Sequence, residues 1–471
     1  MKRKEFLTSI GRLSGLGLSV LLPVHNDVEG IFTEQNQEIK TAGRIKRFGD
    51  GRDWFFEKRF GLFIHWGIYS IPGWHEQHQY RGKVKRSEYI KLKDQWNPVS
   101  FDPEKWLDLL EEAGMKYLTI TTKHIDGFCM WDTKQTSFNT MNTPYRKDII
   151  RMVADACHKR DIPLCFYYSN VDNNHPNYPN KGRAHEVPPE PGDKPDIEKY
   201  ITFMREQIRE LCINYGKVSG FWWDAIRWKE DVDRDPGLNQ MIRELQPGII
   251  INDRGFDRGD FGTPERDFEV DNTLSFERPT EACQAVGRES WGYRVDEEYY
   301  TDLHLISSID RYLTRDANYL LNVGPKPDGT IDPESTAILK RIGKWYSSVR
   351  ESLEGVLPAS GLTANKNVTL TSRDRTLYVH LNRETQVNAV KLNPINVMPV
   401  KASLLNNGQK INVRLRFNPS DHRISGQKAY LNLLNLPINE LCNKVPVIKL
   451  EFDCPLDQLI QSSSANDGIL S

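Results

Sequence analysis

The stretch KYLTITTKHIDGF, residues 116–128, joins a strand-like run to a cluster of polar side chains. Its first seven residues are mostly aromatic, aliphatic or β-branched, which predicts a buried strand. Lys123, His124 and Asp126 follow at once, and Gly127 permits the chain to turn. Polar groups gathered where a buried strand ends are typical of a parallel barrel, in which function lies at the carboxyl ends of the strands.

Strands of this kind recur along the chain and alternate with segments of helical period. The candidates are 61–65, 116–122, 163–168, 218–223, 248–252 and 318–323. Nearly continuous apolar strands between helices predict a parallel sheet covered on both faces. Six repeats, with room for others between 254 and 300, favour a (β/α)8-like TIM barrel over an open doubly wound sheet. No G-x-G-x-x-G follows any strand, which excludes the usual dinucleotide site.

The predicted helices have recognisable starts. Asp102-Pro103 and Asp332-Pro333 each combine an aspartate cap with a proline in the first turn. The first of these helices stops at Gly114, and the second runs to about residue 350. The other helical segments are 147–160, 197–215 and 302–316.

After about residue 355 the pattern changes to short strands and polar turns, as at 367–382 and 447–453. Such runs predict a β-sandwich. We therefore expect an export signal at 1–28, a barrel at 45–354, a C-terminal β-sandwich at 355–456 and a disordered tail at 457–471.

The charge and the cysteines of the chain exclude several kinds of binding partner and metal site. The formal charge of the 471 residues is −1 and no long basic run occurs in the body of the chain, so neither nucleic acid nor a membrane surface is expected. The seven cysteines are scattered and include no CxxC pair, so no zinc framework is predicted. Cys442 and Cys454 could form a disulfide if the chain is exported.

The amino terminus, MKRKEFLTSIGRLSGLGLSVLLPV, places basic residues before a short apolar stretch. This order predicts an export signal, similar to a degenerate twin-arginine signal, and a periplasmic or secreted location. A disordered cytoplasmic leader is the alternative. No segment approaches the ~18 apolar residues of a membrane-spanning helix.

Hydrogen-bonding or ionisable side chains end five consecutive predicted strands. Any one of them could be structural, but five at one rim predict a functional mouth. They are His65, His124, Tyr167 with Tyr168, Asp224, and Asp253 with Arg254.

Asp224 is the sharpest of these candidates. In GFWWD, residues 220–224, side chains alternate, so Trp222 and Asp224 share one face. A carboxylate beside an indole in a barrel mouth is a candidate nucleophile or base, and a structural ion pair with a basic neighbour is the alternative. Cleaving a glycosidic bond needs a second carboxyl group, ~5 Å away in retaining enzymes. Four glutamates in the acidic segment 262–283 compete for that role: Glu265, Glu269, Glu277 and Glu281.

Other chemistries have weaker support. The histidines His65, His124, His175 and His185 show no HExxH or comparable spacing, so neither a catalytic metal nor any other cofactor is expected. A nucleophilic serine would need a G-x-S-x-G motif, which is missing.

Seven motifs together resemble the α-L-fucosidases of glycoside hydrolase family 29, in order and in spacing, over about residues 50–350. They are RFGLFIHWGIYSIPGW (59–74), TTKHIDGF (121–128), FYYS (166–169), FWWD (221–224), NDRGF (252–256), ESWGYR (289–294) and NYLLNVGPKPDGTI (318–331).

This resemblance implies a (β/α)8-like barrel followed by a β-sandwich. It also implies retaining, exo-acting release of terminal α-L-fucose from a fucosylated oligosaccharide or glycoconjugate, through a covalent intermediate. Asp224 would be the nucleophile and Glu265 the acid/base, with Glu281 in reserve. The residues implied to bind the sugar are His65, His124, Tyr168, Trp222, Arg254 and Trp291.

The chain departs from the family pattern in places. Ile125 stands where the family commonly has a second histidine, and Gln77, beside Glu76, stands where many members have glutamate. Asn173-Asn174 replaces aromatic and histidine residues of close relatives. Two alternatives follow: a fucose-binding protein with lost or weak catalysis, and a related glycosidase with a different sugar preference.

Overall fold

The computed structural model describes residues 45–183, 185–224, 237–266, 275–383, 387–417 and 429–460. The chain divides into two units, Met1–Ile39 and Lys40–Ser471, and every described residue belongs to the second. The predicted export signal therefore lies outside the described residues, as does 461–471 of the predicted tail.

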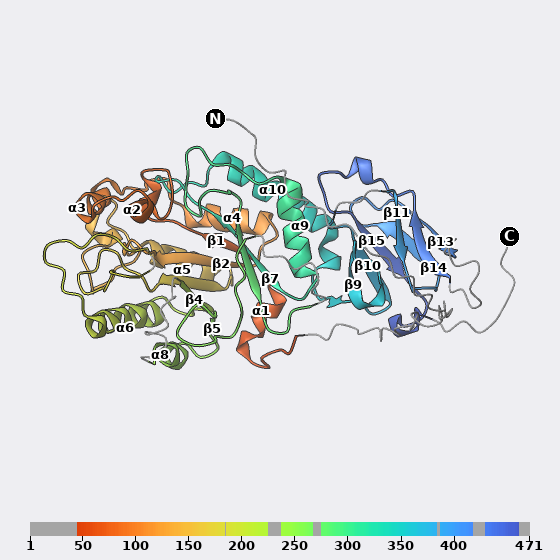
Figure 1. The fold of residues 1–471 in the computed structure, drawn as a ribbon, viewed down its shortest axis with the longest axis horizontal. Helices are drawn as coiled ribbons and strands as arrows, with labels where there is room; N and C mark the ends of the chain where they lie inside the picture. The colour runs from red at the N-terminus through yellow and green to blue at the C-terminus, as the bar shows by residue number, and fades with distance from the viewer. Residues whose placement is uncertain are drawn as a thin grey trace, which may run out of the picture. The chain divides into compact units, whose positions relative to one another are not determined.

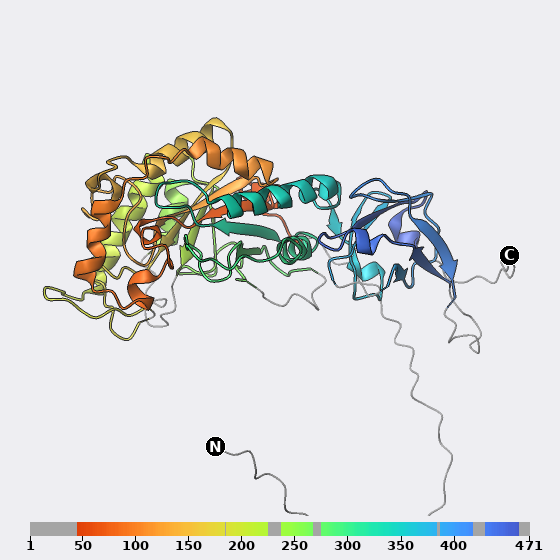
Figure 2. The same cartoon turned by 90° about the horizontal axis from the view of Figure 1, so that it is seen from above.

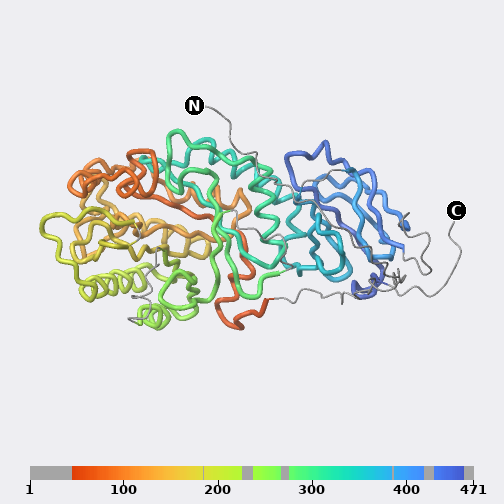
Figure 3. Tube along the Cα trace, viewed as in Figure 1, coloured from red at the N-terminus to blue at the C-terminus, as the bar shows by residue number. Residues whose placement is uncertain are grey.

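A parallel sheet forms the first part of the described chain, with strand order β5-β4-β3-β2-β1-β7-β6. All six predicted strands are confirmed. Figure 1 shows their arrangement, and the trace in Figure 3 follows the chain through them. The strands are β1 (Phe60–Ile64), β2 (Tyr117–Lys123), β3 (Leu164–Ser169), β4 (Gly220–Asp224), β5 (Ile250–Ile251), β6 (Glu281–Ala285) and β7 (Asn318–Val323).

The two outer strands of this sheet, β5 and β6, are joined by an irregular segment at 261–265. Phe261 forms a parallel bridge with Asn252, just beyond β5, and Glu265 forms one with Cys283 of β6. Backbone hydrogen bonds run from Cys283 N–H to the Pro264 carbonyl and from Glu281 N–H to the Gly262 carbonyl. This segment occupies the eighth position and gives the sheet its (β/α)8-like character.

Helices lie around the strands, as Figure 2 shows from above. Two start as predicted, because Asp102 accepts from Glu104 N–H and Asp332 accepts from Ser335 N–H. No helix in the described ranges is long and apolar enough to cross a membrane. The helices are α1 (Trp54–Glu57), α2 (His78–Arg81), α3 (Arg86–Tyr89), α4 (Pro103–Glu112), α5 (Ile149–Lys159), α6 (Ile197–Asn214), α8 (Leu238–Leu245), α9 (Asp302–Leu313) and α10 (Pro333–Val349).

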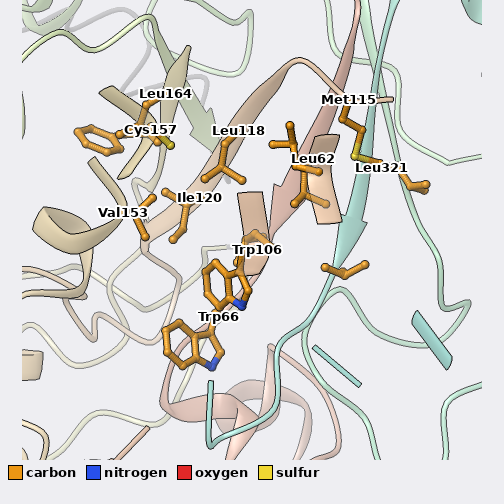
Figure 4. Packing of buried hydrophobic residues seen from close by; sticks show 14 of the residues in the cluster. Leu62, Trp66, Trp106, Met115, Leu118, Ile120, Val153, Cys157, Leu164 and Leu321 are labelled. Carbon is orange, nitrogen blue, oxygen red and sulfur yellow. The ribbon is translucent and has the colours of Figure 1, made fainter. Parts of the chain in front are cut away.

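The core between strands and helices is continuous and tightly packed. Figure 4 shows Leu118 and Ile120 of β2 near Val153 of α5, and the indoles of Trp66 and Trp106 beside one another. The two indoles meet edge to face at 5.2 Å. Each large side chain buried in this way contributes roughly 1.5–3 kcal/mol, so the core holds the strand ends rigidly in place.

The C-terminal strands form two antiparallel sheets with a core of their own, which confirms the predicted β-sandwich. Asp310 of α9 connects it to the barrel, because its carboxylate bonds His380 Nδ1 at 2.7 Å and Asn382 Nδ2 at 2.9 Å. Cys442 and Cys454 are free thiols, so the possible disulfide is not formed. The strands are β8 (Leu357–Pro358), β9 (Thr369–Arg373), β10 (Thr376–His380), β11 (Ala389–Leu392), β12 (Lys401–Leu404), β13 (Asn412–Arg416), β14 (Tyr430–Leu434) and β15 (Val447–Glu451).

Candidate active site

A cavity of about 620 Å³ opens at the carboxyl ends of the parallel strands. It brings together seven of the eight residues expected at the site, although they are scattered along the sequence. These seven are His65, His124, Trp222, Asp224, Arg254, Glu265 and Trp291.

Asp224 ends β4 and is oriented by two hydrogen bonds. The Tyr167 hydroxyl donates to Oδ2 at 2.7 Å, and Arg254 Nη1 donates to Oδ1 at 3.1 Å. Burial raises the pKa of Tyr167 well above its usual value, with the Asp224 charge adding to the effect, so the phenol remains a donor. Both donors stabilise the carboxylate form that a nucleophile needs.

Arg254 lies between two carboxylates. Its Nη1 contacts Asp224, and its Nη2 contacts Glu265 Oε2 at 2.8 Å. Thr263 fixes the guanidinium by accepting from Nε at 2.9 Å, and Arg254 Cζ lies 4.8 Å from the centre of the Trp222 ring. Adjacent nitrogens of one rigid fork therefore bridge two carboxyl groups that line one cavity.

The two glutamates considered for acid/base catalysis occupy different environments. The Glu265 side chain lines the cavity and is 42% exposed. Glu281 is buried, where it accepts hydrogen bonds from Trp222 Nε1 at 3.0 Å and from the Tyr117 hydroxyl. Burial raises the pKa of Glu281 to about 7, against the opposing effect of these two donors. Glu281 therefore holds the Trp222 indole through a buried hydrogen bond, whereas Glu265 lines the cavity itself.

Two neutral imidazoles line the cavity. Burial lowers the pKa of His65 to about 4 and that of His124 well below its usual value. His65 Nδ1 lies 2.6 Å from Asn322 Oδ1, so Nδ1 carries the proton and Nε2 is left as an acceptor. His124 stacks on Tyr167 with ring centres 5.7 Å apart, and its buried Nδ1 has no hydrogen-bond partner within the described ranges. An unsatisfied buried imidazole in a cavity wall suits a ligand hydroxyl.

Tyr168, which was expected to bind the sugar, is not among the residues that line this cavity. Its hydroxyl donates to Gln207 of α6 at 2.7 Å, and Lys123 Nζ lies 4.5 Å from its ring centre. Successive side chains of a strand point to opposite faces. Tyr167, paired in register with Trp222, is the tyrosine that faces inward.

The remaining polar residues of TTKHIDGF are structural. Lys123 is buried and pairs with Asp172 at 3.2 Å, and Asp126 accepts from the Tyr89 hydroxyl at 2.7 Å. Ile125 is buried in the apolar core. Only His124 of this stretch reaches the cavity.

Glu76 is a further buried residue of the cavity wall. Its Oε2 accepts from Ser290 Oγ at 2.8 Å and from Trp291 N–H at 3.0 Å. Asn322 Nδ2 also donates to the Trp291 carbonyl at 2.6 Å. These bonds connect the loop after β1 to the loop after β6 and hold Trp291 against the cavity.

Two carboxyl groups that line one cavity and contact the same arginine are an arrangement that indicates the class of protein, since cleavage of a glycosidic bond needs two such groups and points to a glycoside hydrolase. The alpha-L-fucosidase family model matches residues 33–351. The chain belongs to this family, family 29 of the glycoside hydrolases.

Individual relatives agree with this assignment. Human tissue alpha-L-fucosidase is 28% identical over 341 residues, which cover 65% of this chain and 69% of that one. Alpha-L-fucosidase isoenzyme 1 from Paenibacillus thiaminolyticus is 30% identical with a TM-score of 0.74, covering 86% of this chain and 100% of that chain. A trapped covalent intermediate of a Bacteroides thetaiotaomicron alpha-L-fucosidase, with 2-fluoro-fucosyl fluoride, is 27% identical with a TM-score of 0.73, covering 88% and 98%.

Proposed function

We propose that this protein is a retaining exo-α-L-fucosidase in which Asp224 is the nucleophile and Glu265 the acid/base. The observation that carries the proposal is the Arg254 bridge between the two carboxylates, at 3.1 Å and 2.8 Å. The bridge limits how far apart the two carboxyl groups can lie, and retaining enzymes require a short separation of roughly 5 Å.

In the first step, an Asp224 oxygen attacks the anomeric carbon of fucose while the bond to the leaving oxygen breaks. Glu265 gives its proton to that oxygen. In the second step, Glu265 takes a proton from water, the water oxygen bonds to the anomeric carbon, and the Asp224 carboxylate leaves.

The side chains at the floor of the cavity support a deoxy sugar as substrate. Phe63 and Trp222 give apolar surface, and His65 and His124 give neutral hydrogen-bonding groups for hydroxyls. The solved relative that traps a covalent intermediate holds a fucosyl derivative. A terminal fucose of an oligosaccharide or glycoconjugate fits this chemistry.

The test is Asp224→Ala on an aryl α-L-fucoside, with azide as an external nucleophile. We expect the wild type to turn over, the variant to lose activity by roughly 10³-fold or more, and azide to restore it as β-L-fucosyl azide. Comparable activity in the variant would contradict the role of Asp224. Fucose binding without turnover by the wild type would instead favour a binding protein, and turnover of another aryl glycoside alone would favour a different sugar.

We also propose export to the periplasm or the medium, supported by the basic and apolar order of residues 1–28. Fractionation of producing cells tests this proposal. Replacing Lys2, Arg3 and Lys4 with glutamine should retain the protein in the cytoplasm.

A further inference from the structure

The outer part of the cavity is lined by residues that do not follow a strand directly. Tyr80 and Arg81 belong to α2, and His185 belongs to the loop before α6. Tyr80 is 38% exposed, whereas Trp222 at the floor is 3% exposed. An exo-acting enzyme holds the terminal sugar at the closed end, so the leaving group extends along this outer wall.

Arg81 is held in place at this wall without a carboxylate partner. Its Nε donates to Gln77 Oε1 at 2.8 Å, and within the described ranges no Asp or Glu forms an ion pair with it. Arg254 at the floor differs, because it bonds two carboxylates. The Nε of Arg81 is therefore held by Gln77, and its two terminal nitrogens can donate hydrogen bonds to an anion.

A second arginine, Arg266, adds positive charge beside Trp291, which lines the cavity. Arg266 Cζ lies 4.9 Å from the centre of the Trp291 ring, and its Nη1 donates to the Arg288 carbonyl at 2.9 Å. It too forms no ion pair with Asp or Glu in the described part of the chain. Burial lowers the pKa of His75 to about 3, and the positive charges of Arg81, Arg294 and Arg266 lower this pKa further.

Tyr80 offers a surface beside these charges. His185 contacts its ring edge to face, with centres 5.2 Å apart and planes at 83°. This contact supports one edge of the phenol ring and leaves an apolar ring face that can cover a sugar ring. An aromatic face beside an available guanidinium matches a sugar that carries a negative charge.

We propose that this outer wall is a leaving-group subsite for an acidic sugar, one that carries a carboxylate or a sulfate ester. Arg81 binds the anion through its guanidinium, and Tyr80 stacks on the ring. The inference rests on the proposed function, because it requires fucose at the floor of the cavity. It assigns the substrate class as fucose linked to an acidic glycan.

The experiment compares kcat/KM for three substrates with the same fucosyl linkage: a neutral disaccharide leaving group, its sulfated form and its uronate form. We expect the wild type to favour at least one anionic form by roughly tenfold, which is the scale of a charge-assisted hydrogen bond. Preference for the sulfate or for the uronate identifies the source of the charge. The preference should shrink in high salt, because the subsite is partly exposed.

Arg81→Gln should reduce the ratio of anionic to neutral kcat/KM to near one, and Arg81→Lys should retain part of it. Arg341→Gln is the matched control, because Arg341 is an exposed arginine of α10 that pairs with Asp302. This variant should keep the wild-type ratio of anionic to neutral kcat/KM. Equal rates on neutral and anionic substrates, or an unchanged ratio in Arg81→Gln, would overturn the inference. Turnover of an aryl α-L-fucoside, measured in parallel, separates that result from failure of the proposed function itself.

Discussion

The Tyr167 hydroxyl donates a 2.7 Å hydrogen bond to Asp224, whereas its neighbour Tyr168 donates to Gln207 on the other face of the sheet. Two adjacent tyrosines of β3 thus provide a matched pair for experiment. Tyr167 donates to the candidate nucleophile, and Tyr168 donates to a residue of α6.

Tyr167→Phe should lower kcat/KM on an aryl α-L-fucoside by roughly 10- to 100-fold, because a hydrogen bond to a charged group is lost. Tyr168→Phe should lower the free energy of unfolding by about 1 kcal/mol and leave kcat/KM within a few-fold of wild type. Steady-state kinetics measure kcat/KM, and urea unfolding measures the free energy of unfolding, for each variant. Equal kinetic losses in the two variants would contradict the orientation of β3.

Azide products should distinguish Glu265 from Glu281. When the acid/base of a retaining enzyme is removed, azide attacks the covalent intermediate and the product keeps the α configuration. We expect Glu265→Ala to form α-L-fucosyl azide from an activated aryl fucoside and Glu281→Ala to form none. NMR of the products is the measurement, and α-azide from Glu281→Ala would reverse the assignment.

Glu281 should make the protein less stable as pH rises. Its pKa is raised to about 7 in the fold from a usual value of 4.5, so the folded state binds more protons than the unfolded state in this interval. Its contribution is therefore present below about pH 4.5 and is lost by about pH 7, with a size of at most a few kcal/mol.

Glu281→Gln cannot titrate and keeps an oxygen for Trp222 Nε1. Urea unfolding of wild type and variant at pH 5 and pH 7.5 gives the difference between their pH dependences. This difference also removes the contribution of Asp126, whose pKa burial likewise raises to about 7. If the free energy of unfolding changes equally with pH in the two proteins, Glu281 does not titrate with a raised pKa in the folded state.

Glu76→Ala should raise KM more than it lowers kcat. The change removes the acceptor of Trp291 N–H and Ser290 Oγ, so the Trp291 loop loses its attachment to the loop after β1. We expect a rise in KM of roughly tenfold. Ser290→Ala removes one of these bonds and should have a smaller effect; an equal effect would mean that the attachment depends on the hydroxyl alone.

The strands were predictable where apolar and β-branched residues run together, but β6 was not. Its sequence, EACQA, carries a glutamate and a glutamine because Glu281 lies beneath Trp222 and Gln284 is buried in the sheet. Tertiary partners, not local propensity, make this segment a strand.

The candidate site was predictable where a residue ends a strand or follows it within three positions, as His65, His124, Asp224 and Arg254 do. The cavity is lined by Tyr167 and not by the expected Tyr168, because the alternation of side chains along a strand defines two faces without showing which one points inward. Glu76 and His185 lie within long loops, where no periodicity signals their position.

The irregular segment at 261–265 gives the two carboxylates unequal freedom. Asp224 pairs in register with Ser169 of β3, and the start of its strand also pairs with β5 at Gly220 and Phe221, so its backbone belongs to a regular ladder. Glu265 lies on a segment joined by isolated bridges, which can yield locally without unzipping a ladder. The proposed nucleophile therefore lies on a strand of the continuous sheet, while the proposed acid/base lies on a segment that can shift locally.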